Sequence, residues 1–283
     1  MGITKVTVLG AGSMGNGIVQ VSAQAGYEVT MIDVNGDALA KGMANIQKML
    51  DGGVKRDKIT ASDRDAAMGR ITTATDFSQA SRADLVIEAV PEDLELKKEL
   101  FKQLDQICPT HTILATNTSS LPITSIAAVT SRPAQVMGMH FMNPVPLMKG
   151  VEIIKGRMTS PQTMETGKKF IESINKVWVE AVDYAGFIAS RVLDVMLNEA
   201  VWCVMDGNKP EEIDKAMKIC TNFPMGPLEL IDMAGADVLL NVMEIMEKEF
   251  GDKYRPAPLL RQMVRAGHVG RKAGRGFYDY SGK

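Results

Sequence analysis

Short apolar runs, each bounded by glycine or polar residues, recur along the first two thirds of the chain. Their lengths and their content of Val, Ile, Leu and Met are typical of strands, and the runs at 5–9, 83–90, 112–117 and 135–141 are typical of buried ones. Helical or loop-like segments separate most of them, and this alternation predicts a doubly wound α/β sheet. The runs lie at residues 5–9, 27–33, 83–90, 112–117, 135–141, 151–156 and 176–183.

The segments between the runs carry helical patterns. After the first run, Ile18, Val19 and Ala25 share one apolar helical face, and Gly26 is suited to end that helix. Residues 36–70 are polar and rich in helix-forming residues. We therefore expect a helical excursion there that projects from the sheet.

The pattern changes after the last strand-like run. Residues 187–207 and 210–220 each predict an amphipathic helix, and one or two more are expected within 227–251. The sequence thus predicts two domains: residues 1–185, which contain the sheet, and residues 186–283, which are all-helical.

The composition argues against several classes of partner and site. With 45% hydrophobic residues, 23% charged residues and a net charge of -2, the chain is typical of a globular protein and gives no reason to expect nucleic acid or an anionic membrane as a partner. Cys108, Cys203 and Cys220 have neither metal-ligand nor disulfide spacing, which favours a reducing compartment and no metal. No secretory or membrane-spanning segment is evident. We therefore expect a cytoplasmic protein.

The loop after the first strand reads Gly10-Ala11-Gly12-Ser13-Met14-Gly15 and is followed by Asp33 at the end of the second strand. The three glycines permit a tight turn, a close approach of backbone to a pyrophosphate, and close packing of helix on strand. The helix that follows offers its N-terminal N–H groups to phosphate. The loop therefore predicts a dinucleotide-binding Rossmann domain.

Asp33 narrows the choice of cofactor. Its carboxylate can accept hydrogen bonds from ribose hydroxyls and would repel a 2′-phosphate, which favours NAD over NADP. FAD uses the same glycine pattern, but no second flavin motif is evident. A glycine-rich turn without a ligand is the remaining alternative.

His140 lies at the end of the strand-like run 135–141, and Glu152 lies in the next run. A histidine in an apolar segment is more often a core residue. However, ligands bind at the carboxyl ends of strands in doubly wound sheets, where this side chain is expected. A dehydrogenase needs a group that takes a hydroxyl proton, and a carboxylate on the other ring nitrogen would orient it. His111 and His268 are expected to be exposed.

A second polar group follows the run 112–117. The hydroxyl and amide groups of Asn117-Thr118-Ser119-Ser120 can orient a substrate oxygen or the nicotinamide carboxamide, although the same residues are common in a helix-capping turn. Together with His140, Asn143 and Glu152, this stretch predicts an active site.

Seven motifs carry a resemblance to the 3-hydroxyacyl-CoA dehydrogenase family, which covers nearly the whole chain. They are "VLGAGSMGNGI", "EAVPED", "NTSSLPIT", "GMHFMNPVP", "VEII", "NFPMGPLELID" and "GRKAGRGFYDY". The resemblance implies an N-terminal Rossmann domain, a helical C-terminal domain that mediates dimerisation, and NAD-linked oxidation of (S)-3-hydroxyacyl-CoA to 3-ketoacyl-CoA. Among such enzymes the chain is most similar to those that act on 3-hydroxybutyryl-CoA.

The resemblance also implies roles for individual residues. His140 would be the general base, Glu152 its orienting partner, and Ser119 a hydrogen-bond partner of the substrate C3 oxygen. The dinucleotide loop and Asp33 would hold the adenine half of NAD. The nicotinamide half would be lined by Glu92, Lys97, Asn117, Ser119 and Asn143. From the residues alone, Glu92 and Lys97 are typical of exposed charges at the start of a helix.

Two basic residues match family positions. Arg56 matches a lysine near the CoA phosphates, and Arg275 matches a tail residue that reaches the cofactor. There are also departures. Ser190 stands where the family has an asparagine that contacts the substrate, and Gly52 stands where a second basic residue is usual. Reduced activity or an altered acyl-CoA preference is expected from them.

Two other functions remain open at this stage. One is a dehydrogenase for a longer 3-hydroxyacyl-CoA, or for a free hydroxy acid such as a sugar acid. The other is a binding or structural protein that keeps the fold and has lost turnover.

Overall fold

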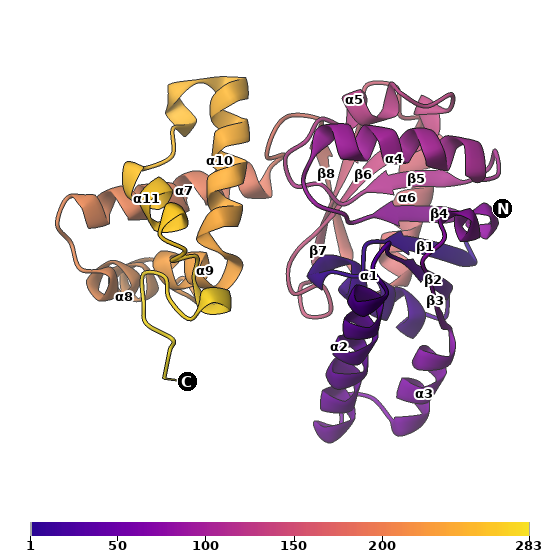
Figure 1. Cartoon of the computed structure of the whole chain (residues 1–283), viewed down its shortest axis with the longest axis horizontal. Helices are drawn as coiled ribbons and strands as arrows, with labels where there is room; N and C mark the ends of the chain where they lie inside the picture. The colour runs from indigo at the N-terminus through magenta and orange to yellow at the C-terminus, as the bar shows by residue number, and fades with distance from the viewer. Residues whose placement is uncertain (1, 283) are drawn as a thin grey trace. The chain divides into compact units, whose positions relative to one another are not determined.

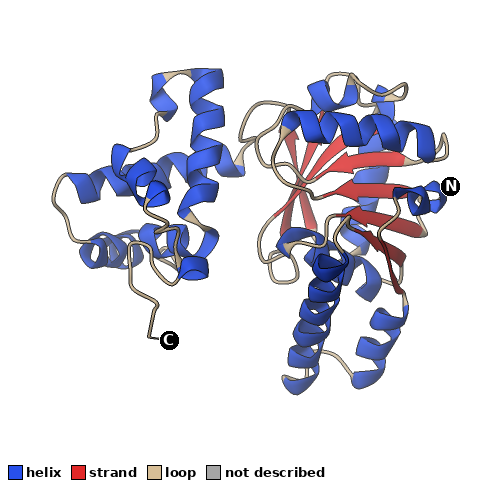
Figure 2. Ribbon diagram, viewed as in Figure 1, coloured by secondary structure: helices blue, strands red, loops and turns tan. Residues whose placement is uncertain are grey.

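The computed structural model describes residues 2–282. Contacts divide the chain into two compact units, Met1–Asp183 and Tyr184–Lys283. The first unit holds every strand of the sheet and the second is helical (Figure 1, Figure 2). The fold class predicted from the alternation of strands and helices is confirmed.

The sheet of unit 1 has eight strands in the order β3-β2-β1-β4-β5-β6-β7-β8. All neighbours pair in parallel except β6 and β7, which are antiparallel. The strands are β1 (Lys5–Leu9), β2 (Glu28–Ile32), β3 (Ile71–Ala74), β4 (Leu85–Glu88), β5 (Ile113–Thr116), β6 (Val136–Phe141), β7 (Gly150–Lys155) and β8 (Val177–Val182).

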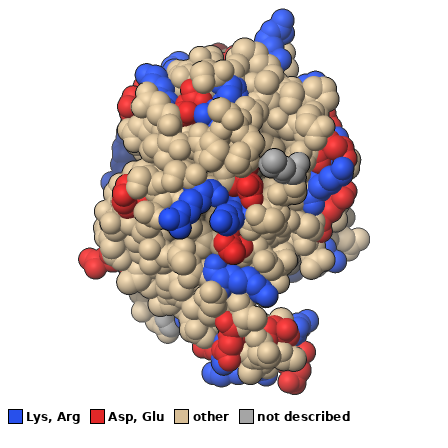
Figure 3. Space-filling model, turned by 90° about the vertical axis from the view of Figure 1, so that its right-hand side faces the viewer, with Lys and Arg blue, Asp and Glu red and all other residues tan. Residues whose placement is uncertain are grey.

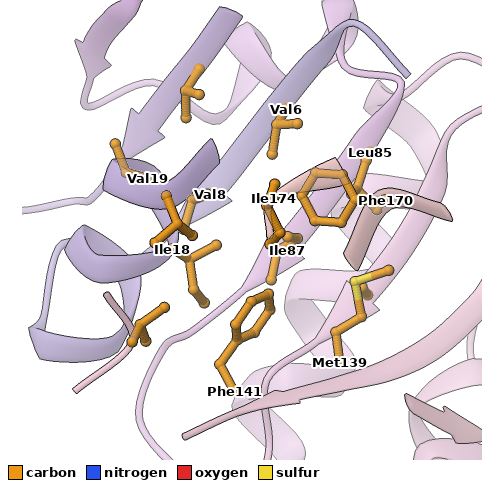
Figure 4. Packing of buried hydrophobic residues seen from close by; sticks show 14 of the residues in the cluster. Val6, Val8, Ile18, Val19, Leu85, Ile87, Met139, Phe141, Phe170 and Ile174 are labelled. Carbon is orange, nitrogen blue, oxygen red and sulfur yellow. The ribbon is translucent and has the colours of Figure 1, made fainter. Parts of the chain in front are cut away.

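Helices cover both faces of this sheet. On one face, side chains of α1 and α6 pack against β1, β4 and β6 (Figure 4). On the other, Phe101 of α4 and Ile123 of α5 are fully buried. The α-helices of unit 1 are α1 (Ser13–Gln24), α2 (Gly36–Lys55), α3 (Ala61–Gly69), α4 (Leu94–Ile107), α5 (Ile123–Ala127) and α6 (Pro161–Ser173), with short 3-10 turns at Phe77–Arg82 and Pro133–Gln135.

The helical excursion predicted for residues 36–70 is present as α2 and α3 (Figure 1). Asn35 caps α2, because its side chain accepts the Asp37 N–H at 2.9 Å. Thr60 and Asp63 form a reciprocal capping box at the start of α3. Both helices therefore begin where side-chain oxygens satisfy the first N–H groups.

Two features of the sheet were not predicted. Strand β3 is a short edge strand whose Thr72 and Thr73 are exposed, so it lacks the apolar run that marks the buried strands. The antiparallel pairing of β6 with β7 places His140 and Glu152 directly opposite each other in the register. The β6–β7 hairpin therefore brings together the histidine and the carboxylate that the sequence analysis singled out.

Unit 2 has its own apolar core, which includes the fully buried Val201, Leu228, Met243 and Leu260. Asn198 of α7 accepts the Ala257 N–H at 2.8 Å and donates to the Arg255 carbonyl at 3.1 Å. Its helices are α7 (Ala189–Met205), α8 (Pro210–Thr221), α9 (Pro227–Ala234), α10 (Ala236–Phe250) and α11 (Pro258–Arg265), with 3-10 turns at Asp252–Tyr254 and Arg271–Ala273.

Asp194 of α7 makes stability depend on pH. Burial raises the pKa of its carboxyl from 3.8 to about 7. Because the unfolded chain ionises first, stability falls as pH rises between the two pKa values, by about 1.4 kcal/mol per unit, and is level above the folded pKa. Asp194→Asn is expected to raise Tm, and its advantage over wild type should grow by a few °C from pH 5.5 to pH 8. Thermal unfolding at both pH values checks this, and an advantage independent of pH would contradict it.

Two surface properties concern partners. Among the described helices, none is both long enough and apolar enough to span a bilayer. On the face seen in Figure 3, Lys and Arg side chains are interspersed with Asp and Glu.

Candidate active site

The dinucleotide loop joins β1 to α1. Gly10 has φ +99°, and a Cβ there would lie 2.6 Å from the Ala89 carbonyl oxygen. A Cβ on Gly15 would lie 1.8 Å from the Gly10 carbonyl oxygen, whereas a Cβ on Gly12 would meet no atom within 4 Å. Gly10 and Gly15 are therefore required by the fold of the loop. Gly12 instead borders open space on the exposed side of the loop.

The start of α1 suits an anion. The helix begins at Ser13, Gly12 is its N-cap, and no side chain caps it or places an acidic group in its first turn. Such a helix N-terminus presents N–H groups and a partial positive charge. The open space at Gly12 together with this N-terminus fits the pyrophosphate of NAD.

Asp33 follows β2 and faces the same loop. Its Oδ2 accepts the Ala11 N–H at 2.8 Å, and its Oδ1 accepts the Asn35 N–H at 3.0 Å. The carboxylate thus braces the loop, and each oxygen retains a lone pair that a ribose hydroxyl can use. This geometry fits the adenosine ribose of NAD.

The His140 and Glu152 side chains form a hydrogen bond of 2.8 Å between Nδ1 and Oε2. Both residues are buried, at 7% and 4% exposure. Because the carboxylate is an acceptor, it fixes the ring hydrogen on Nδ1 and leaves Nε2 as the basic nitrogen. The pair has the arrangement of an oriented general base.

The segment after β6 connects this pair to the cofactor loop. Asn117, after β5, accepts the Phe141 N–H at 2.9 Å through Oδ1. Asn143 accepts a hydrogen bond from the Ser13 hydroxyl at 3.4 Å. The ends of β1, β5 and β6 are therefore joined by side chains that the sequence singled out.

Glu92 organises the loop that carries Ser119. Its Oε1 accepts the N–H of Ser119 at 3.0 Å and that of Ser120 at 3.2 Å, and it contacts the Thr118 hydroxyl at 2.5 Å. The Ser119 hydroxyl lies 3.3 Å from the same oxygen. Glu92 thus fixes the position of Ser119, and its side chain is only 20% exposed.

Lys97 is not the exposed charge that its place near the start of a helix predicted. It is 1% exposed, and its ammonium lies 2.5 Å from Glu88 Oε1 and 3.2 Å from the Val90 carbonyl oxygen. Glu92 Oε2 lies 3.5 Å away. Such a pair is costly to break because the partner charge would remain buried. Lys97 therefore holds β4 and the Glu92 loop together.

Sequence reasoning missed two anchors of this site. Glu88 accepts hydrogen bonds from Lys97 and from the Thr116 hydroxyl, the latter at 2.7 Å. Asp183 accepts the Ile123 N–H at 2.8 Å and the Thr124 N–H at 2.7 Å, at the start of α5. Each is an ordinary acidic residue at a strand end, and no spacing in the sequence distinguishes it.

The remaining predicted residues lie elsewhere in the two units. Arg56 ends α2, where a Cβ on Gly52 would lie 3.4 Å from its guanidinium nitrogens. Ser190 is the second residue of α7. Arg275 belongs to unit 2, where it forms isolated bridges with Gly270 and Asp279. Within the described part of the chain, no cluster of three or more His, Cys, Asp or Glu side chains could hold a metal ion.

Known proteins match the chain over its whole length. Residues 5–184 match the NAD binding domain of 3-hydroxyacyl-CoA dehydrogenase, and residues 186–280 match the C-terminal domain of the same family. A Bacillus subtilis protein named "Probable 3-hydroxybutyryl-CoA dehydrogenase" is 50% identical in sequence. The match covers 100% of this chain and 99% of that protein. The 3-hydroxybutyryl-CoA dehydrogenase of Clostridioides difficile is 46% identical over 98% of this chain and 99% of its own. The solved structure of (S)-3-hydroxybutyryl-CoA dehydrogenase from Ralstonia eutropha superposes with a TM-score of 0.93 at 45% identity, over 98% of this chain and 99% of its own.

Proposed function

Because the chain belongs to the 3-hydroxyacyl-CoA dehydrogenase family of NAD-dependent oxidoreductases, we propose that it interconverts (S)-3-hydroxybutyryl-CoA and acetoacetyl-CoA. The observation that carries the proposal is the 2.8 Å hydrogen bond between His140 and Glu152 at the end of β6. The names of the relatives support the four-carbon substrate.

In this proposal His140 is the general base. Its Nε2 takes the proton of the substrate 3-hydroxyl group as C3 loses a hydride, and it returns a proton to the oxygen in the reverse reaction. Bound NAD supplies the hydride acceptor. Glu152 stabilises the imidazolium that forms and keeps the ring oriented. Ser119 is the hydrogen-bond partner of the C3 oxygen, and its loop is held in place by Glu92. Its hydroxyl, which donates to Glu92 at 3.3 Å, would turn to the substrate oxygen on binding.

The surface of α2 supports a CoA thioester as the substrate. A hollow of about 590 Å³ is lined by Lys48, Lys55 and Arg56 around Gly52, and also by Asp51, whose carboxylate pairs with Arg64 at 3.1 Å. Since Gly52 has no side chain, the Arg56 guanidinium lies over that position. The three cations can therefore bind phosphate even though a basic residue is missing at position 52.

The substrate is tested by measuring NADH oxidation with three acceptors, and by replacing NADH with NADPH. Acetoacetyl-CoA is compared with a longer 3-ketoacyl-CoA, with free acetoacetate, and with NADPH in place of NADH. We expect the highest kcat/KM for acetoacetyl-CoA with NADH. A higher value for the free acid would favour a hydroxy-acid dehydrogenase. NADH binding without turnover of any acceptor would favour a binding protein.

Ser190 is proposed to position the substrate less well than the asparagine usual in the family. An asparagine offers separate donor and acceptor groups, whereas serine offers one hydroxyl. Ser190→Asn is expected to raise kcat/KM for acetoacetyl-CoA roughly fivefold, and Ser190→Ala to lower it. Steady-state kinetics of the three proteins check this, and an unchanged kcat/KM in the Asn variant would show that serine at position 190 does not weaken catalysis.

We also propose a homodimer that forms through unit 2. Several apolar side chains of this unit are exposed, among them Val192 at 70%, Ile219 at 68% and Val238 at 50%. They lie on α7, α8 and α10, and an interface formed by these helices would remove them from water. Sedimentation velocity is expected to give the mass of two chains, and Ile219→Glu to shift the protein towards the monomer. A monomer in the wild type would contradict the dimer.

A further inference from the structure

Lys176, immediately before β8, is a buried cation whose ammonium binds two backbone carbonyl oxygens. It is 8% exposed. Its ammonium donates to the Val145 and Met148 carbonyl oxygens, at 2.6 Å each. Among the described residues, no carboxylate oxygen lies within 4.0 Å of it. Burial accordingly lowers the pKa of this ammonium.

The two carbonyls belong to the connection between β6 and β7, residues 142–149. Inside this connection the Leu147 and Met148 N–H groups both bond to the Pro144 carbonyl at 3.0 Å, so it is a compact turn. Lys176 bridges the turn from outside. Lys149 also accepts the Val177 N–H at 2.9 Å, which ties the end of the turn to β8.

The same turn contacts the cofactor loop. Val145 is 1% exposed and packs so closely on α1 that a Cβ on Gly17 would lie 2.8 Å from the Val145 Cβ. Asn143 accepts a hydrogen bond from Ser13. Ser13, Gly17, Asn143 and Val145 line one hollow of about 260 Å³. The position of the turn therefore sets the position of Asn143 against the start of α1.

We propose that Lys176 is a positioning residue for cofactor binding, which holds the 142–149 turn and through it Asn143. The proposal rests on the proposed function, because Asn143 is expected, from the family resemblance, to line the nicotinamide half of the NAD that this function uses. The reason for an ammonium is geometric. Two backbone carbonyls of the turn point at one buried spot, and a cation with several donors satisfies both at once.

The test is the Kd for NADH, measured by fluorescence titration of the intact protein without acyl-CoA. Lys176→Met fills the same space without donors and is expected to raise Kd about tenfold. Lys176→Arg again offers donors to both carbonyls and should recover most of the affinity. In turnover, the KM for NADH should rise more than kcat falls. If the Met variant does not fold, Lys176→Gln is measured instead. Its side chain is shorter and cannot donate to both carbonyls, so its Kd for NADH is expected to rise about threefold to fivefold above that of the wild type.

Thr112→Val is the matched control. It removes a buried hydrogen bond of 2.6 Å from the Thr112 hydroxyl to the Ala83 carbonyl, at the opposite end of β5. It should lower Tm and leave the Kd for NADH unchanged. A wild-type Kd for NADH in Lys176→Met or Lys176→Gln, or an equal rise of this Kd in Thr112→Val, would overturn the proposal. Wild type that binds NADH but does not reduce acetoacetyl-CoA would contradict the proposed substrate alone.

Discussion

Replacing His140 by asparagine is expected to lower kcat for acetoacetyl-CoA reduction by about 10²–10⁴-fold. The asparagine amide N–H₂ can occupy the place of Nδ1 and still donate to Glu152, so the buried carboxylate keeps its partner. What disappears is the second ring nitrogen, which carries the proton in the proposed mechanism. The measurement is steady-state NADH oxidation.

Two further variants separate the roles within the pair. Glu152→Gln retains a hydrogen-bonding side chain but removes the charge, and a smaller loss of about 10–100-fold is expected. Because the two residues act as one unit, the double variant should be little worse than His140→Asn alone. NADH affinity and Tm are the controls. Near-wild-type turnover in His140→Asn, with NADH still bound, would show that another group carries the proton.

The second large effect is expected at the dinucleotide loop. One glycine there is required by the fold of the loop, and another leaves space for the cofactor. Gly15→Ala forces a Cβ to within 1.8 Å of the Gly10 carbonyl oxygen, so both Tm and NADH binding should fall. Gly12→Ala meets no protein atom within 4 Å, so the protein should keep its Tm. Its methyl group nevertheless occupies the space assigned to the pyrophosphate. We expect the Kd for NADH to rise by roughly 10–100-fold in Gly12→Ala.

Gly36→Ala is the control for these variants. Gly36 begins α2, and a Cβ there also meets no atom within 4 Å. The Kd for NADH should be that of the wild type, and Tm should be equal to it or slightly higher, because alanine restricts the unfolded chain more than glycine does. Calorimetry and fluorescence titration provide the two quantities. Unchanged NADH affinity in Gly12→Ala would mean that the cofactor does not lie against this loop.

Most of the strands that could be predicted are buried. The edge strand β8 is largely exposed and was predicted all the same, because its valines form an apolar run in the sequence. Residues 85–88 and 113–116 are buried throughout, and their apolar runs show in the sequence. Strand β3 shows no apolar run in the sequence, because Thr72 and Thr73 at the sheet edge face solvent. The end of α1 could be predicted from the glycine at position 26. Gly26 adopts φ +101°, a conformation that glycine readily takes and that ends the helix.

The site was predictable where chemistry and position in the fold coincide, and less so where contacts cross the sheet. His140 could be placed at a strand end from the apolar run before it. Its hydrogen bond to Glu152 depends on the hairpin register, which the 142–149 turn determines and the sequence does not reveal. The place of Glu92 in the Ser119 loop depends on donors 26 to 28 residues later in the chain. The burial of Lys97 follows from Glu88, nine residues earlier on β4.

The most direct test of the account is the pH dependence of kcat/KM in both directions, for wild type and His140→Asn. We predict that oxidation of (S)-3-hydroxybutyryl-CoA by the wild type requires a single group in its unprotonated form. Reduction of acetoacetyl-CoA should require the same group in its protonated form. This ionisation should be absent from the residual activity of the variant. The same ionisation at the same pH in His140→Asn would contradict the assignment of His140 as the general acid and base.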